Sequence, residues 1–231
     1  MKKWMMLSLI LIVLAGCQSA LLGGGQTIIE WVNFIKWNGQ DFNSIDSGVL
    51  ADNQYIGEKV GTVNFKLADN VTNPSYKTKD GDAAFYEKGT EIYSIKGNND
   101  LLAVKSENSI NGYQLFYSTE STEYKWHFKH MPLDEVKKIE IYTQVNNKRI
   151  AEIVDKGRIE DFLEILNTSV EDKDFAPNTN NRDSITYEMI FYTDGPIAYN
   201  FDMQFDGNTY FWYPWDACIL SDDIKEFIPE N

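Results

Sequence analysis

Alternating apolar and polar positions dominate the first part of the folded chain and predict antiparallel strands. In TIIEWVNFIKWNGQDFNS, β-branched and aromatic residues flank an Asn-Gly pair, the preferred sequence of a two-residue type I′ turn. A turn at this pair places Ile35 opposite Phe42, an apolar cross-strand contact that favours the register. Further strands are expected at residues 61–68, 91–96, 101–105 and 113–117. Between them, DGDAAFYEKG is expected to form a single helical turn.

The pattern changes after KWHFKHMPLDE, where Pro132 and a cluster of charges place a boundary near His130. The segments EVKKIEIYT and NNKRIAEIVD alternate as half-buried strands do. From Asp155, a suitable N-cap, to Asn167 the apolar spacing becomes helical. The positions with this i, i+3, i+4, i+7 spacing are Ile159, Phe162, Leu163 and Leu166.

The last part of the chain is expected to be a β-meander with turns at Asp-Gly pairs. A two-residue turn at positions 206 and 207 pairs Phe205 with Asn208, Met203 with Tyr210 and Phe201 with Trp212. The helix should cover the face that carries Met203 and Trp212. The opposite face then presents Asp202 beside Phe211 and Tyr213. The polar stretch SVEDKDFAPNTNNRDS is expected to be a loop, and Ser221 to cap a final short helix.

Together these elements predict an α+β protein, mainly antiparallel β-sheet with two short helices, in two small subdomains. The first is expected to span residues 27–130 as a mainly antiparallel β unit. The second is expected to span residues 131–231 as an α+β unit. The composition, with 43% hydrophobic and 14% aromatic residues, is that of a globular protein.

Residues 1–16 have the zones of a secretion signal: a basic start, an apolar run and small residues at the end. The apolar run is too short for a membrane span, which needs about 20 residues. The sequence Leu14-Ala15-Gly16-Cys17 resembles the lipobox of bacterial lipoproteins. This resemblance implies that Cys17 carries a diacylglycerol with acyl chains such as palmitate, and that the protein is held at the extracytoplasmic face of the cell membrane. Residues 17–26, with three consecutive glycines, are expected to form a flexible tether.

Two stretches, AAFYEKGTEIYSIKG and KKIEIYT with GRIEDFLEIL, are similar to poorly characterised cell-surface lipoproteins of Gram-positive bacteria. The resemblance extends over much of the mature chain. It brings no catalytic motif, so it transfers no active site.

Charge and cysteine content narrow the classes of partner. The net charge is −14, and removal of the signal leaves 19 basic against 35 acidic residues, a net charge of −16. Nucleic acid is disfavoured as a partner, because its binding depends on basic patches. The negative net charge is explained by the solubility that it gives the protein. The alternative explanation is that the charge serves to bind a basic partner or a divalent cation. If Cys17 is lipidated, no intramolecular disulfide can form, and Cys218 is expected to be a buried, unreactive thiol.

Few residue patterns point to chemistry, and we expect no catalytic residue, metal or cofactor. His127 and His130 could share a helical face, but a zinc site needs three or four ligands. Asp80-Gly81-Asp82 lacks the remaining ligands of a calcium loop and is better interpreted as a turn. The carboxylates of Asp161 and Glu164 fall on the exposed helical face.

The sequence therefore favours a non-enzymatic binding or interaction module anchored at the membrane. Phe211, Tyr213 and Asp202 are the candidate binding residues, with a protein as the expected partner. The alternative is a protein that binds cell-wall carbohydrate or a small molecule with the same aromatic residues. A hydrolase is third, and would need a histidine beside a nucleophile and an orienting group.

Overall fold

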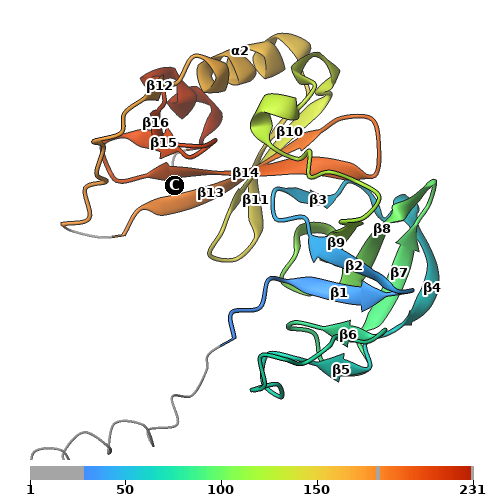
Figure 1. The fold of residues 1–231 in the computed structure, drawn as a ribbon. Helices are drawn as coiled ribbons and strands as arrows, with labels where there is room; N and C mark the ends of the chain where they lie inside the picture. The colour runs from blue at the N-terminus through green and yellow to red at the C-terminus, as the bar shows by residue number, and fades with distance from the viewer. Residues whose placement is uncertain (1–28, 181–182, 230–231) are drawn as a thin grey trace, which may run out of the picture.

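The computed structural model describes residues 29–180 and 183–229, which form two β-sheets (Figure 1). The predicted signal peptide, Cys17 and the tether lie outside the described residues. Only one segment of the described chain is an α-helix, and most of its regular secondary structure is β-strand. The predicted α+β class is therefore corrected to a mainly antiparallel β fold. The predicted two-part division loosely fits the two sheets.

The first sheet runs in the order β4-β7-β8-β9-β2-β1-β6-β5, and we call it and its loops the first lobe. Every pair is antiparallel except β5 with β6. The predicted hairpin is confirmed, with Ile35 opposite Phe42. Its strands are β1 (Phe34–Trp37), β2 (Gln40–Ser44), β4 (Ile56–Thr62), β5 (Phe65–Lys66), β6 (Asp82–Ala83), β7 (Glu91–Ile95), β8 (Asn98–Lys105) and β9 (Tyr113–Ser118).

Two expectations for the first lobe are wrong. The strand expected at residues 61–68 is broken, because β4 pairs with β7 whereas β5 pairs with β6. The chain changes partner at Val63, which is buried and bonds through its backbone N–H to the oxygen of Thr90 at 2.9 Å. DGDAAFYEKG forms no helical turn, since Ala83 pairs with Ile35 as part of β6. Tertiary pairing overrides the local propensity in both places.

The second sheet runs in the order β11-β10-β13-β14-β15-β16-β12, and we call it and its helices the second lobe. Its strands are β10 (Lys138–Thr143), β11 (Lys148–Ile153), β12 (Val170–Glu171), β13 (Ile185–Tyr192), β14 (Ile197–Phe205), β15 (Tyr210–Trp212) and β16 (Cys218–Ile219). One further strand, β3 (Gly48–Leu50), comes from the N-terminal part of the chain and pairs with β14. This pairing crosses the boundary that we placed near His130 and ties the two lobes together.

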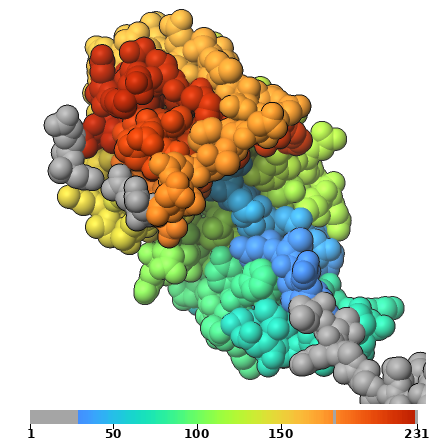
Figure 2. Space-filling view, turned by 90° about the vertical axis from the view of Figure 1, so that its left-hand side faces the viewer, coloured from blue at the N-terminus to red at the C-terminus, as the bar shows by residue number. Residues whose placement is uncertain are grey.

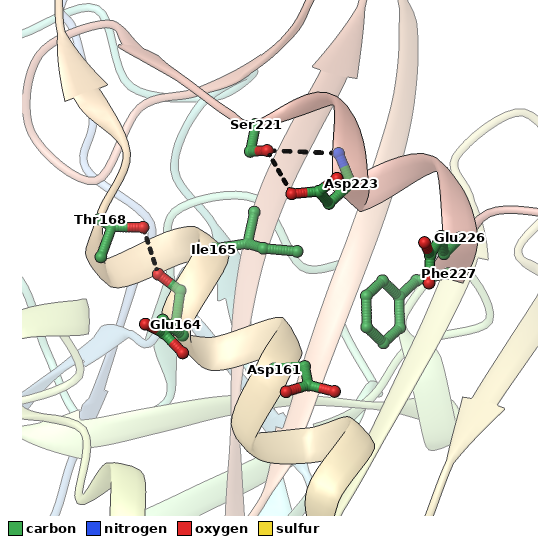
Figure 3. Close-up of a pocket in the computed structure, with 8 residues that line it drawn as sticks. All are labelled: Asp161, Glu164, Ile165, Thr168, Ser221, Asp223, Glu226 and Phe227. Atoms are coloured by element: carbon green, nitrogen blue, oxygen red, sulfur yellow. Dashed lines mark hydrogen bonds between the residues drawn. The ribbon is translucent and has the colours of Figure 1, made fainter.

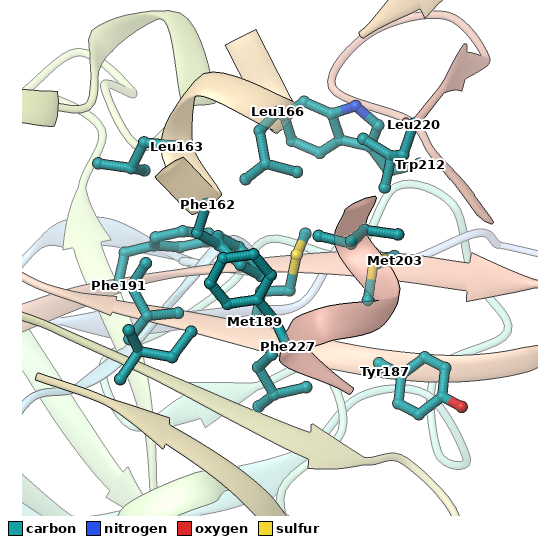
Figure 4. Packing of buried hydrophobic residues seen from close by; sticks show 14 of the residues in the cluster. Phe162, Leu163, Leu166, Tyr187, Met189, Phe191, Met203, Trp212, Leu220 and Phe227 are labelled. Atoms are coloured by element: carbon teal, nitrogen blue, oxygen red, sulfur yellow. The ribbon is translucent and has the colours of Figure 1, made fainter. Parts of the chain in front are cut away.

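One face of the second sheet is covered by α2 (Lys156–Asn167) and the 3₁₀ helix η5 (Asp222–Phe227). Asp155 caps α2 as predicted, because its carboxylate accepts a hydrogen bond from the Arg158 N–H at 3.0 Å. The second expected helix, which Ser221 caps, is the 3₁₀ helix η5 rather than an α-helix. Figure 4 shows the apolar side chains of both helices against those of the sheet. The remaining 3₁₀ turns are η1 (Asn53–Tyr55), η2 (Ile110–Gly112), η3 (Phe128–His130) and η4 (Leu133–Glu135).

The register of the last hairpin differs from the prediction by two residues. Met203 lies opposite Trp212, and Phe205 opposite Tyr210. The cause is the buried Asp206, whose carboxylate accepts hydrogen bonds from the backbone N–H groups of residues 208 and 209 at 2.9 and 2.8 Å and so opens a longer turn. A shift of two residues keeps each side chain on its face, so Met203 and Trp212 still pack under α2.

The opposite face of the second sheet meets the first lobe and holds a buried carboxylate. Glu140 is 3% exposed and accepts hydrogen bonds from Tyr192 at 2.6 Å and Tyr142 at 2.9 Å. It also forms ion pairs with Lys138 at 3.0 Å and Arg149 at 2.6 Å. Burial raises the pKa of Glu140, but these four donors outweigh burial and lower it to about 2.

The two lobes are distinct in the space-filling view, with residues of the second lobe coloured yellow to red (Figure 2). They are joined by β3 and by an apolar cluster that includes Val49, Ile110 and Tyr192. Gly48 is needed at this seam, because a Cβ there would lie 2.8 Å from side-chain carbons of Ile197 and Ile45. Among the described residues, no helix combines the length and apolar character needed to cross a bilayer.

Candidate binding surface

The three predicted binding residues do not form one surface. Phe211 is fully buried, which corrects the expectation that it is exposed. The ring of Phe175 lies over it, with 4.9 Å between ring centroids. Phe175 belongs to the loop that follows β12. The backbone N–H of Asn178 in this loop donates a hydrogen bond to the Asp206 carboxylate at 2.9 Å. The polar loop therefore covers a sheet face that the alternation alone leaves open.

Tyr213 and Asp202 do reach the surface. The Tyr213 side chain is 51% exposed, and its ring packs against Phe211 at 5.8 Å. Asp202 is exposed on β14 and lies opposite Glu188 of β13. Desolvation by neighbouring residues raises the pKa of both carboxyl groups. The charge of Asp202 raises the pKa of Glu188 further.

Trp215 is the most prominent exposed aromatic side chain of this region, at 78% exposure. It is the last residue of the Tyr-Pro-Trp sequence that directly follows β15. The Lys129 Nζ lies 5.7 Å from the centre of its ring, and the His127 ring lies 6.0 Å away. Trp215 belongs to the second lobe, whereas both neighbours come from the segment that leaves the first lobe. The sequence analysis named Phe211 and Tyr213 as candidate binding residues but did not single out Trp215, which lies two positions after Tyr213.

A chain of ring contacts supports this surface from below. Tyr124 contacts His127 at 4.9 Å and Trp126 at 5.4 Å, and Tyr117 contacts both Tyr124 and Trp126 at 5.5 Å. Trp126 is buried, so the rings extend from the core of the first lobe to the exposed Trp215. We call Trp215, His127, His130 and Lys129, together with Tyr213, which is exposed two positions before Trp215 in the chain, the aromatic surface.

Hydrogen bonds fix the segment that carries the histidines. The Ser47 hydroxyl bonds to the Tyr124 hydroxyl and donates to the Trp126 carbonyl at 2.6 Å. His127 and His130 are neighbours across η3, with 5.8 Å between ring centroids. Within the described residues, neither histidine side chain forms a hydrogen bond or an ion pair. The Ser47 hydroxyl, which is bonded within this segment, is thus engaged with a tyrosine and a carbonyl rather than with an imidazole.

Two hollows lie elsewhere on the molecule and differ in chemistry. A hollow of about 340 Å³ next to the aromatic chain is lined by Tyr117, Thr119, Glu120, Ser121, Thr122, Glu123 and Tyr124. A groove of about 400 Å³ between α2 and η5 is lined by Asp161, Glu164, Ile165, Thr168, Ser221, Asp223, Glu226 and Phe227 (Figure 3). Asp161 and Glu164 are exposed on the helix, as predicted. In the groove, the Thr168 hydroxyl donates to the Glu164 carbonyl and the Ser221 hydroxyl to the Asp223 carboxylate. The groove is therefore lined by four carboxylates, and both of its hydroxyl groups already donate hydrogen bonds.

The remaining candidates have structural roles. Asp80 accepts a hydrogen bond from the Gly39 N–H at 2.7 Å, and the buried Asp82 accepts one from Tyr76 at 3.0 Å. The interpretation of this segment as a turn is confirmed by Gly81, whose φ is +87°. Cys218 is a free, half-buried thiol in β16. No group of three or more metal-ligating side chains comes together in residues 29–180 and 183–229.

The aromatic surface is thus the part of the described chain that best fits a binding role. Comparisons with protein-family models, with curated proteins and with solved structures find no match to this chain.

Proposed function

We propose that this chain is a membrane-anchored extracytoplasmic lipoprotein that acts as a non-enzymatic binding module for a protein partner. Trp215 carries the proposal. An indole that is 78% exposed leaves a large apolar area in water, and Tyr213, 51% exposed, lies two residues away. Trp and Tyr are the residues that most often dominate the energy of protein interfaces.

The aromatic surface is also held in place before any partner arrives. The rings of Trp215 and His127 are in contact, and Lys129 lies over the indole. Tyr124 supports His127 from the first lobe and is itself bonded to Ser47. Side chains that are already ordered lose less entropy on binding, so more of the contact energy contributes to affinity.

Substitution of the exposed rings tests the interaction. The membrane-anchored protein is crosslinked in its native membrane, and its partners are identified by mass spectrometry. We expect one reproducible partner, whose yield falls at least tenfold in Trp215→Ala and in Tyr213→Ala. Phe85→Ala is the matched control, because Phe85 is 47% exposed but belongs to the first lobe. Equal yields from all three variants and the unaltered protein would exclude the aromatic surface as the contact.

The anchoring part of the proposal rests on the lipobox resemblance at Cys17. Intact-mass measurement of the membrane form should show a diacylglycerol-sized increment that is absent in Cys17→Ala. A wild-type protein that lacks this increment would remove the anchor from the proposal.

Binding of cell-wall carbohydrate is the second candidate, and the hollow beside the aromatic chain favours it. Tyr117 and Tyr124 offer ring surface, while Glu120 and Glu123 offer carboxylates that form no ion pair within the described residues. Rings together with polar groups suit a sugar. Co-sedimentation with purified wall polysaccharide, lost in a Glu120→Gln, Glu123→Gln double variant and kept in Trp215→Ala, would favour this candidate over a protein partner.

A further inference from the structure

A small pocket of about 210 Å³ lies in the seam between the two lobes. It is lined by Asn98, Leu101, Lys125, Trp126, Pro132, Glu135, Thr193, Asp194, Gly195, Pro196, Ile197 and Tyr199. These residues come from the first half of β8, the segment between the lobes, the start of β14, and the turn that joins β13 to β14, which reaches toward β8 (Figure 1). Small-molecule sites occur preferentially at such junctions between structural units. The pocket is smaller than the roughly 300–1,000 Å³ of drug-sized sites, so it suits a compact molecule.

The pocket carries two opposite charges that do not neutralise each other. Lys125 and Glu135 both line it, yet neither forms an ion pair within the described residues. The Lys125 ammonium lies 5.8 Å from the centre of the Trp126 ring instead. The third charge, Asp194, is already matched by Lys137 at 2.6 Å. One cation and one anion therefore remain available in the same pocket.

The floor between these charges is largely apolar and firmly held. Leu101, Trp126 and Ile197 are buried and belong to one core cluster. The Tyr199 ring packs against this cluster, and the charge of Glu135 adds to burial in raising the pKa of its hydroxyl. Glu135 thus acts on the tyrosine side of the pocket, whereas Lys125 lies beside the tryptophan.

We propose that this seam pocket binds a small zwitterion, of the class of free α-amino acids and dipeptides. The ligand's carboxylate pairs with the Lys125 ammonium, its ammonium group pairs with the Glu135 carboxylate, and its carbon skeleton covers the Trp126 and Tyr199 floor. A charge-assisted hydrogen bond forms at each end, which a neutral analogue cannot provide. This site is separate from the aromatic surface, so it does not depend on the proposed protein partner.

Fluorine NMR of the whole protein labelled with 5-fluorotryptophan tests the proposal, with Trp126→Phe used to assign the Trp126 signal. The probes are the proteinogenic L-amino acids and a set of dipeptides, each beside its N-acetylated, C-amidated derivative. We expect at least one zwitterion to shift the Trp126 signal with a sub-millimolar dissociation constant. Its neutral derivative should bind at least tenfold more weakly.

Paired variants separate the pocket from general charge effects. Lys125→Gln and Glu135→Gln should each weaken binding at least tenfold. Lys105→Gln at the end of β8 and Asp134→Asn, which alter charges outside the pocket lining, should leave it unchanged. An unaltered urea unfolding midpoint in each variant shows that it is folded. If no probe shifts the Trp126 signal, or if neutral derivatives bind as well as zwitterions, the proposal is overturned.

Discussion

Replacement of Glu140 by Gln should destabilise the protein strongly at neutral pH and hardly at all in acid. The Glu140 side chain is only 4% exposed and is surrounded by four donors, two of them cationic. Its pKa falls from 4.5 to about 2. Each unit corresponds to about 1.36 kcal/mol, so the charged form contributes on the order of 3 kcal/mol to folding at pH 7.

The sign of the pH dependence follows from the lowered pKa. The contribution is complete above the unfolded-state value of 4.5 and is lost as the pH falls through about 2. At pH 3, about 2 kcal/mol of it should already be gone. The glutamine variant lacks this component at every pH, so the difference in unfolding free energy between the two proteins should shrink steadily from pH 6 to pH 2.5.

Urea unfolding followed by circular dichroism measures this difference. With an m-value of about 2–3 kcal/mol/M, a loss of about 3 kcal/mol lowers the midpoint at pH 7 by about 1–1.5 M. Glu152→Gln is the matched control, because Glu152 also pairs with Arg149 at 2.6 Å but its side chain is 41% exposed. This control should lose at most about 1 kcal/mol. A Glu140→Gln effect that equals the control, or that is the same at pH 2.5 as at pH 6, would refute the reasoning.

Two further predictions concern local packing. Asp155→Ala should lower the unfolding free energy by about 1 kcal/mol through loss of the α2 N-cap, whereas Asp155→Asn should retain most of it, as urea midpoints will show. Gly61→Ala should cost about 1–3 kcal/mol, because the new Cβ would lie 2.0 Å from a ring carbon of Trp37. The double variant with Trp37→Leu should recover part of this loss, and additive losses in the double-mutant cycle would show that the ring is not the cause.

Local sequence signals predicted the elements whose determinants lie close together in the chain. The β1–β2 hairpin follows from an Asn-Gly turn and one cross-strand pair. The helix α2 follows from a cap and an apolar stripe, and its buried residues are the four that the spacing predicted. The face of β15 was also correct, because alternation fixes a side chain's face even when the register shifts by two residues.

The errors arise where distant or side-chain interactions decide. The register of β14 with β15 depends on the Asp206 carboxylate, which binds backbone N–H groups and lengthens the turn. Phe211 is buried because Phe175, 36 positions earlier in the printed sequence, folds over it. No periodicity encodes that contact.

The candidate sites were harder to predict because they are assembled across the two lobes. The contact of Trp215 with His127 and the seam pocket both depend on how the lobes meet, and that arrangement relies on the β3–β14 pairing. The alternation along the last strands placed Phe211 and Tyr213 on one face but did not show which of the two rings reaches the surface. The exposure of a side chain depends on tertiary structure, which leaves Tyr213 and Trp215 exposed and buries Phe211.

Site-specific photocrosslinking tests the binding role most directly. A photoreactive phenylalanine analogue is placed at position 215 in the membrane-anchored protein, or at position 85 as the control of similar chemistry in the first lobe. Our account predicts one discrete crosslinked protein from position 215 and none from position 85. Diffuse or identical products from both positions would contradict the proposal that the aromatic surface binds a specific protein partner.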